Sequence, residues 1–342
     1  GRRARFWAEF TLVVIVIVFA SLSSQFLTTT NLVIMTRHVA FNAILALGML
    51  LVILNGGIDL SVGSIVGISG MIAGYLLRGW QPPGTEIVAY PSVWVVIAVS
   101  CIVGMLAGYI NGILVSRFNV APFIATLGML YAVRGLAELI SNGRTFTALS
   151  GQESLGNTGF VPLLKDSVLG VPAPIWIMAA IALILSLYLS RAPFGRWLYA
   201  SGSNERAAEL SGVPIRLVQV RIYVISGLCA GIVGLLLTAD LSAAVPQGGS
   251  GYELNAIAAV VIGGAALSGG RGTIRGTLIG AFVIGFLVDG LVLVGVSVFW
   301  QEVIKGVVII SAVALDQAQQ RMQRRRTVRE DTSTQPADPG VG

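Results

Sequence analysis

Long uninterrupted apolar runs constrain this chain more than any other feature of its sequence. They approach or reach the roughly 20 residues that a helix needs to cross the hydrocarbon layer of a membrane. Inside lipid every backbone amide must find its partner within the segment, so these runs are predicted to be helices. The clearest examples are Phe10–Ala20, Ile44–Leu54, Val93–Val103, Ile175–Leu189 and Gly280–Val296.

Composition agrees with a membrane protein. Charged residues make up only 11% of the chain, whereas a soluble domain carries about 25%. The alternating pattern of an outer-membrane barrel is absent. We therefore predict an all-α fold, a polytopic transmembrane helix bundle of about ten spans. They are expected near residues 8–27, 39–54, 60–77, 92–115, 122–140, 173–190, 217–240, 254–269, 273–296 and 299–316.

The expected spans define one transmembrane domain, residues 1–316, with an external loop at 141–172 and a cytoplasmic loop at 191–216. The spans at 39–54 and 254–269 are short, so each is expected to be tilted, broken or partly re-entrant. Residues 317–342 are polar and basic and then rich in Pro, Asp and Gly, which predicts a disordered cytoplasmic tail. The first run could imitate a signal peptide, but it continues without a clear small-residue cleavage site, which favours a span.

The basic residues predict the orientation of the bundle. Lys and Arg gather on the cytoplasmic side of membrane proteins. If the N-terminus is cytoplasmic, most of the 22 basic residues lie on that side, and Arg37, Arg78, Arg144 and Lys165 lie outside. This distribution favours an even number of spans with both termini cytoplasmic, and eight spans with two re-entrant segments would fit equally well. Because the charges sit at segment ends, the net charge of +6 does not indicate a nucleic-acid partner.

Glycine spacing predicts close helix packing. Small residues four apart on one helical face let two backbones approach each other in lipid. The stretches Gly104–Val115 and Gly276–Val292 also look faintly alike, which would fit an internal repeat. The spaced glycines are Gly63/Gly67, Gly70/Gly74, Gly104/Gly108/Gly112, Gly227/Gly231 and Gly272/Gly276/Gly280.

Ionisable residues at membrane depth are costly and need an explanation. Arg134 and Glu138 lie four apart on one predicted helix, so they could form a mutually satisfied pair or line a pathway. Glu302 and Lys305 are read in the same way. Asp289 has no partner nearby in sequence and is expected to find one on another helix.

Two segments outside the spans can each be interpreted either as purely structural or as functional. In Asn55–Ser61 the glycine turn predicts that Asp59 or Ser61 caps the next helix, and a gate at the inner mouth of a pathway is the alternative. Within 191–216, Ser203 or Asn204 can cap a short helix that Gly212 ends. Such a helix is either a plain amphipathic connector or a contact for a partner that transmits force.

Several catalytic and cofactor signatures are missing. The sequence has no G-x-x-x-x-G-K-[ST] motif, so it cannot bind ATP through a P-loop. It also lacks H-E-x-x-H, and a single histidine, His38, excludes a site built from several His ligands. Cys101 and Cys229 sit inside apolar runs and are expected to be core residues. No cofactor is predicted, and ATP-driven transport would require an ATPase on another polypeptide.

Six stretches, in this order, resemble one family over about residues 35–316. The family comprises permease subunits of bacterial ABC importers for simple sugars of the ribose, xylose and arabinose type. Its superfamily also includes branched-chain amino-acid permeases. The stretches are Asn55–Ser64, Gly108–Val115, Pro122–Met129, Gly202–Val213, Gly251–Gly264 and Leu267–Thr273.

The resemblance implies a transport subunit of the bacterial inner membrane that is not itself an enzyme. Its partners would be ABC ATPase subunits, a periplasmic substrate-binding protein, a second permease subunit and membrane lipid. Residues 203–213 would be the coupling helix that docks on the ATPase. The residues implied there are Asn204, Glu205, Arg206, Ala207, Ala208 and Gly212, and Glu205 departs from the family pattern because Arg206 separates it from the alanine pair.

The same resemblance suggests where solute and binding protein would contact the chain. Gln247 and Glu253 would face the binding protein, and Phe123 and Thr126 would lie near the pathway. Asn55, Asp59, Arg134, Glu138 and Asp289 are further pathway or gate candidates. A secondary transporter, which needs ion-coupling groups in the membrane, is the main alternative, and an intramembrane enzyme is a remote one. The sequence leaves the solute open.

Overall fold

The computed structural model describes residues 2–308 except 82–83, together with residues 310, 311 and 314. It divides into two units, residues 1–295 and 296–342. The predicted tail at 317–342 lies outside the described residues. In the second unit, residues 298–308 are helical, and Lys305 Nζ lies 2.6 Å from Glu302 Oε1, so the predicted pairing of these two side chains is confirmed.

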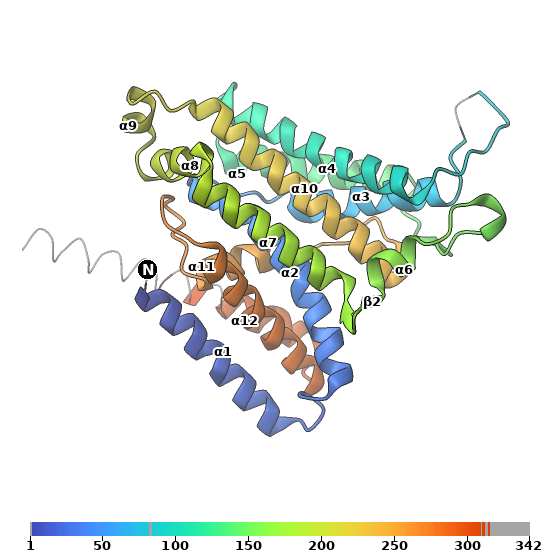
Figure 1. Cartoon of the computed structure of the whole chain (residues 1–342), viewed down its shortest axis with the longest axis horizontal. Coiled ribbons are helices and arrows are strands. Elements are labelled where there is room, and N and C mark those ends of the chain that lie inside the picture. The colour runs from blue at the N-terminus through green and yellow to red at the C-terminus, as the bar shows by residue number, and fades with distance from the viewer. Residues whose placement is uncertain (1, 82–83, 309, 312–313, 315–342) are drawn as a thin grey trace, which may run out of the picture. The chain divides into compact units, whose positions relative to one another are not determined.

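The first unit is built from helices with a few very short strands (Figure 1). Its long or apolar helices are α1 (Arg2–Leu22), α2 (Thr29–Leu54), α3 (Val62–Leu77), α4 (Val93–Ser116), α5 (Pro122–Leu139), α7 (Ala173–Arg191), α10 (Ile215–Leu241), α11 (Tyr252–Ile262) and α12 (Ile274–Leu293). The shorter helices are η1 (Glu153–Leu155), α6 (Phe160–Lys165), α8 (Pro193–Ser203) and α9 (Glu205–Leu210).

Six helices are long and apolar enough to cross a membrane: α2, α4, α5, α7, α10 and α12. Residues 8–22 of α1, together with α3 and α11, are shorter apolar helices. These helices agree with the prediction of a polytopic, mainly helical membrane protein. Each of these helices overlaps one of the expected spans.

Helix α2 differs from its predicted span. The expectation of a short segment at 39–54 was wrong, because the helix begins at Thr29 and runs for 26 residues. Thr28 caps it by accepting a hydrogen bond from the Asn31 amide. The first part of the helix contains several polar residues, so the apolar pattern of the sequence did not predict that the helix begins at Thr29. Thr36 bonds back to the Leu32 carbonyl within the helix, and Arg37 pairs with Asp240 of α10.

The other span expected to be short is interrupted, as predicted. Helix α11 has only 11 residues and ends at Ile262. A non-helical run then leads to α12, whose first turn is capped by Thr273 through the Gly276 amide. Gly264 and Gly269 in this run have positive φ angles of 86°, which glycine adopts without steric cost.

The long loop at 141–172 is more ordered than its Gly and Pro punctuation suggested. Strand β1 (Phe146–Thr147) pairs with β4 (Ala243–Ala244), which follows α10. Strands β2 (Ser167–Val168) and β3 (Val171–Pro172) form a hairpin before α7. Asn157 donates a hydrogen bond to the Leu77 carbonyl at the end of α3. These contacts hold the loop against the ends of α3 and α10.

Helices α2 and α10 form the centre of the first unit. Residues 43–54 of α2 are all buried, and α10 packs against α2, α3 and α4. Glycines make the α4–α10 contact close. A Cβ added at Gly104 would overlap the Gly227 carbonyl oxygen, and one added at Gly108 would overlap that of Tyr223. The predicted role of the spaced glycines in close packing is confirmed at this interface.

Candidate functional site

The turn between α2 and α3 carries a buried hydrogen-bond network centred on Asp59. Its side chain is fully buried. Oδ1 accepts from the Ser61 amide at 3.0 Å and from the Ser61 hydroxyl at 2.6 Å, and Oδ2 accepts from the Ser226 hydroxyl of α10 at 3.0 Å. A buried carboxyl group is tolerated only when its oxygens have such partners. Asp59 therefore fastens the turn to α10.

The network extends to two more helices. Asn111 of α4 donates to the Ser61 hydroxyl at 2.8 Å. Thr126 of α5, itself buried, donates to the Ile58 carbonyl at 3.1 Å. The predicted capping by Ser61 was wrong: Ser61 occupies the cap position of α3, but its side chain makes no capping hydrogen bond. Its hydroxyl is occupied by Asp59 and Asn111 instead. Asp59 accepts the amide of Ser61, the residue directly before α3, and no amide within the helix.

The same turn is joined to the segment at 191–216. The Ser201 hydroxyl of α8 donates to Asn55 Oδ1 at 2.8 Å, directly after the last residue of α2. A Cβ added at Gly202 would overlap the Leu54 carbonyl oxygen, so only glycine permits this approach without a shift. The Tyr199 hydroxyl donates to the Gly272 carbonyl at 2.9 Å, and burial raises the pKa of Tyr199, which keeps the hydroxyl protonated. Helix α8 is thus fixed to α2 and to the run before α12.

Helix α9 follows α8 and has the predicted cap and end. Asn204 Oδ1 accepts from the Ala207 amide at 3.0 Å, and Gly212 has a φ angle of 83°, typical of a residue that ends a helix. Ala208 is buried, whereas Ala207 is exposed and Leu210 is 76% exposed. Arg206 and Glu209 form an exposed ion pair at 3.2 Å. Figure 1 places α8 and α9 at one end of the long helices, away from α6.

Arg134 makes different contacts from the predicted ones. Its Nη1 donates to the Pro246 carbonyl at 2.7 Å and to the Gly248 carbonyl at 3.1 Å, both in the connection between α10 and α11. The expected hydrogen-bonded pair with Glu138 was wrong, because the side chain reaches across to these carbonyls. Gly67 of α3 leaves the space that the guanidinium occupies.

The residues expected to face a binding protein lie beside Arg134. Gln247 is exposed between the two carbonyls that Arg134 binds. Glu253 is half-buried near the start of α11, and its Oε1 accepts from the Gly251 amide at 3.3 Å. Its Oε2 is buried without a hydrogen-bond partner among the described residues. Glu253 also lies against Gly63 of α3, where a Cβ would overlap the carboxylate.

Asp289 finds a partner on another helix, as predicted. His38 of α2 lies between two acids: its Nδ1 is 3.8 Å from Asp289 Oδ1, and its Nε2 is 3.9 Å from Asp240 Oδ2. Asp240 also pairs with Arg37 at 2.9 Å, and its carbonyl accepts from Lys165 at 2.6 Å. Sequence reasoning missed His38 because the residues before 39 were read as a loop. Phe123, by contrast, is 55% exposed on α5.

Six long apolar helices define a multi-pass membrane protein. Hydrogen bonds at the turn after α2 join that turn to three of the others, α4, α5 and α10. Residues 31–313 match the family described as the permease component of a branched-chain amino acid transport system, and the chain belongs to this family. The resemblance carried by the six sequence motifs is confirmed. The chain is a transport component and not an enzyme.

Relatives match nearly the whole chain. It is 43% identical over 306 residues to the ribose import permease protein RbsC of Bacillus subtilis. The matched region covers 89% of this chain and 90% of that protein. It is 40% identical to RbsC of Escherichia coli K12, over 90% and 92% of the two chains. It is 37% identical to the D-allose transport system permease protein AlsC of the same strain, over 92% and 93%. No solved structure matches the chain.

Proposed function

We propose that this chain is the membrane-spanning permease subunit of an ATP-driven importer for a sugar or related polyol. The similarity to ribose and allose permeases over about nine-tenths of both chains carries the proposal. The solute would be delivered by a periplasmic binding protein and would cross by alternating access. The permease would lie in the bacterial inner membrane and work with ABC ATPase subunits and a second permease subunit.

The proposed topology has about ten spans with both termini cytoplasmic. The distribution of Lys and Arg supports it. In Figure 1 the start of α1 lies at the same end of the long helices as α8 and α9, which agrees with a cytoplasmic N-terminus if the segment at 191–216 is cytoplasmic. The helices α2, α4, α5, α7, α10 and α12 supply six of the spans.

In this proposal α9 is the contact for the ATPase. Its outer surface presents Glu205, Arg206, Ala207 and Leu210 without cover from the described chain. Movement of α9 would pass through α8 to Asn55 and Leu54 at the end of α2, where Ser201 and Gly202 make contact. From there the Asp59 network would carry it to α4, α5 and α10. ATP binding elsewhere would thereby shift the inward/outward equilibrium of the bundle.

The external gate is proposed where α5 meets the connection between α10 and α11, beside Gly67 of α3. Arg134 joins α5 to the connection between α10 and α11, and Gln247 on that connection is exposed for a binding protein. Exposed Phe123 on α5 is proposed to face the pathway or the second permease subunit. Thr126 would hold α5 in place and not contact solute, because its hydroxyl is engaged with the Ile58 and Pro122 carbonyls.

Uptake in reconstituted vesicles tests the function. We expect labelled ribose, allose or arabinose to accumulate only when the ATPase and the binding protein are both present. Replacing the P-loop lysine of the ATPase should abolish uptake, whereas a protonophore should leave it unchanged. Uptake that survives loss of the ATPase and collapses with the protonophore would support the secondary-transporter alternative.

Arg134→Met should weaken the proposed gate. The change removes two charge-assisted hydrogen bonds to carbonyls, each contributing about 1.5–3 kcal/mol. We expect a lower melting temperature and a several-fold lower uptake rate, measured in detergent and in vesicles. Arg144→Met removes an exposed arginine that follows the same helix and serves as the control. Equal behaviour of the two variants would contradict the gate.

A further inference from the structure

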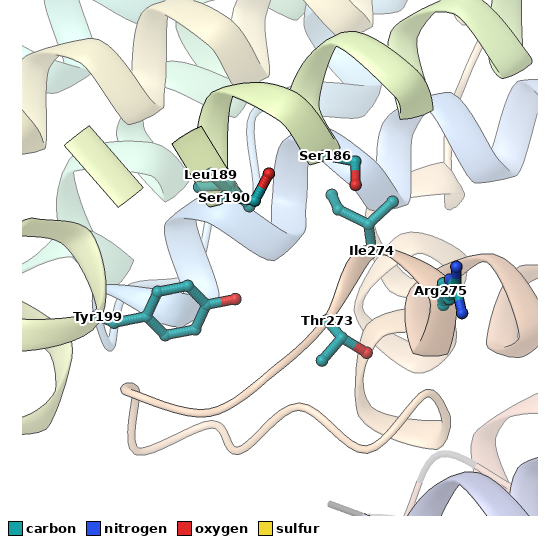
Figure 2. Close-up of a pocket in the computed structure, with 7 residues that line it drawn as sticks. All are labelled: Ser186, Leu189, Ser190, Tyr199, Thr273, Ile274 and Arg275. Carbon is teal, nitrogen blue, oxygen red and sulfur yellow. The ribbon is translucent and has the colours of Figure 1, made fainter. Parts of the chain in front are cut away.

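A pocket of about 430 Å³ opens between the end of α7, helix α8 and the start of α12. Figure 2 shows side chains from these three elements around a common space. It lies outside the Asp59 network and away from Arg134. Its lining residues are Ser186, Leu189, Ser190, Tyr199, Thr273, Ile274 and Arg275.

The lining of the pocket suits an anion. Four of the lining side chains carry hydroxyls, one carries a guanidinium, and none is acidic. The hydroxyls of Tyr199 and Ser190 donate to backbone carbonyls. The donors left for an anion are therefore Arg275 and the hydroxyls of Ser186 and Thr273. Ser186 and Ser190 are one helical turn apart on α7, so they lie on the same side of that helix. Within the described part of the chain, Arg275 forms no ion pair and is exposed. A guanidinium with hydroxyl neighbours is the usual protein partner of a phosphate group.

An apolar surface continues from the pocket along α7. Leu183 is 61% exposed and lies three residues before Ser186, on the same side of the helix. Leu187, 50% exposed, widens this surface. Because α7 is long and apolar enough to span a membrane, its exposed leucines would meet lipid. The site therefore combines a polar, cationic end with an apolar surface. Such a site is complementary to an amphiphilic ligand with an anionic headgroup.

We propose that the pocket binds the phosphate headgroup of an anionic phospholipid, with an acyl chain lying along α7. In the topology proposed above, the pocket sits at the cytoplasmic boundary, where basic pockets between helices bind such headgroups. A free phosphate is also an anion but would meet only one cation in an open site, where a single ion pair is weak. The acyl chain supplies the additional contact that makes retention favourable.

The bound lipid would join three elements that move in the proposed transport cycle. Ser186 and Ser190 belong to α7, Arg275 to α12, and Tyr199 to α8, which is fixed to the end of α2 through Ser201. A headgroup between them would hold α8 against the bundle. The lipid would therefore modulate coupling without contacting solute.

Lipid binding to the purified full-length chain tests the site independently of transport. Phosphatidylglycerol is titrated into detergent micelles, and the concentration that gives half of the melting-temperature increase is recorded. Phosphatidylcholine with the same acyl chains and inorganic phosphate are titrated in parallel. We expect only phosphatidylglycerol to raise the melting temperature. Arg275→Ala should raise its half-effect concentration about tenfold, the loss expected for one charge-assisted contact.

Matched variants separate the pocket from general attraction to charge. Arg196→Ala removes an exposed arginine of α8 that does not line the pocket and should change the half-effect concentration less than twofold. Ser190→Leu should block the pocket while leaving every arginine in place, and should weaken binding as Arg275→Ala does. Equal losses in Arg196→Ala and Arg275→Ala would overturn the proposal. An equal stabilisation by inorganic phosphate would also overturn it, because it would assign the site to free anions.

Discussion

Ala207→Trp is expected to abolish ATP-driven uptake while leaving the permease folded in the membrane. Ala207 is exposed on α9, so an indole there would project from the surface without displacing any core residue. The helix itself would lose only about 0.5 kcal/mol from the lower helix propensity of tryptophan. If α9 docks in a cleft of the ATPase, the added side chain would fill that contact. Uptake should then fall at least tenfold, measured in vesicles with labelled sugar.

The structure identifies which alanine of the pair gives the cleaner test. Ala208 is buried, so a bulky residue there would disturb the packing of α9 itself. Ala200→Trp is the matched control, because Ala200 is exposed on α8 and lies outside the proposed coupling helix. It should retain most of the uptake. Both variants should melt within a few degrees of the wild type, which separates lost docking from lost folding.

ATP hydrolysis provides a second measurement on the same variants. A permease that no longer engages the ATPase through α9 should lose the hydrolysis that the binding protein stimulates. Normal uptake and normal stimulation in Ala207→Trp would remove α9 from the coupling mechanism. Equal losses in Ala207→Trp and Ala200→Trp would show that the contact covers α8 as well, contrary to the assignment to α9.

Features governed by local sequence could be predicted. Asn204 caps α9 and Gly212 ends it, because both effects depend on backbone groups a few residues away. The glycine contacts between α4 and α10 were also predictable, since four-residue spacing places small residues on one face. The spacing predicts which face of each helix packs closely against a neighbour. It does not predict which helix that neighbour is.

Features that depend on distant residues could not be predicted. Arg134 was assigned to Glu138 because they are neighbours on one helix, yet its donors reach carbonyls more than 100 residues away. The start of α2 was missed because its polar residues find partners, such as Asp240, on other helices. Asp59 appeared to be a capping residue, and its contact with Ser226 depends on how α10 crosses the turn. In each case the sequence favoured a local interaction and gave no sign of the tertiary contact, which for Asp59 is added to its local bonds with Ser61.

Asp59→Leu is expected to have the largest effect on stability. The change would leave the Ser61 amide and the Ser61 and Ser226 hydroxyls without their buried acceptor. Each buried donor left without a partner costs about 1–3 kcal/mol. The turn would also lose its link between α2 and α10. We expect a large fall in melting temperature, measured in detergent, and loss of uptake in vesicles.

Two milder variants separate the hydrogen bonds from the shape of the site. Asp59→Asn keeps one acceptor oxygen and nearly the same volume, so it should destabilise less than Asp59→Leu. Ser226→Ala removes a single donor and should cost about 1 kcal/mol. Because Asp59 and Ser226 share one bond at 3.0 Å, their effects should not add in the Asp59→Asn/Ser226→Ala double variant. Additive losses would mean that the bond contributes little to stability. Wild-type stability and uptake in Asp59→Leu would exclude the network as the link from α8 to the bundle.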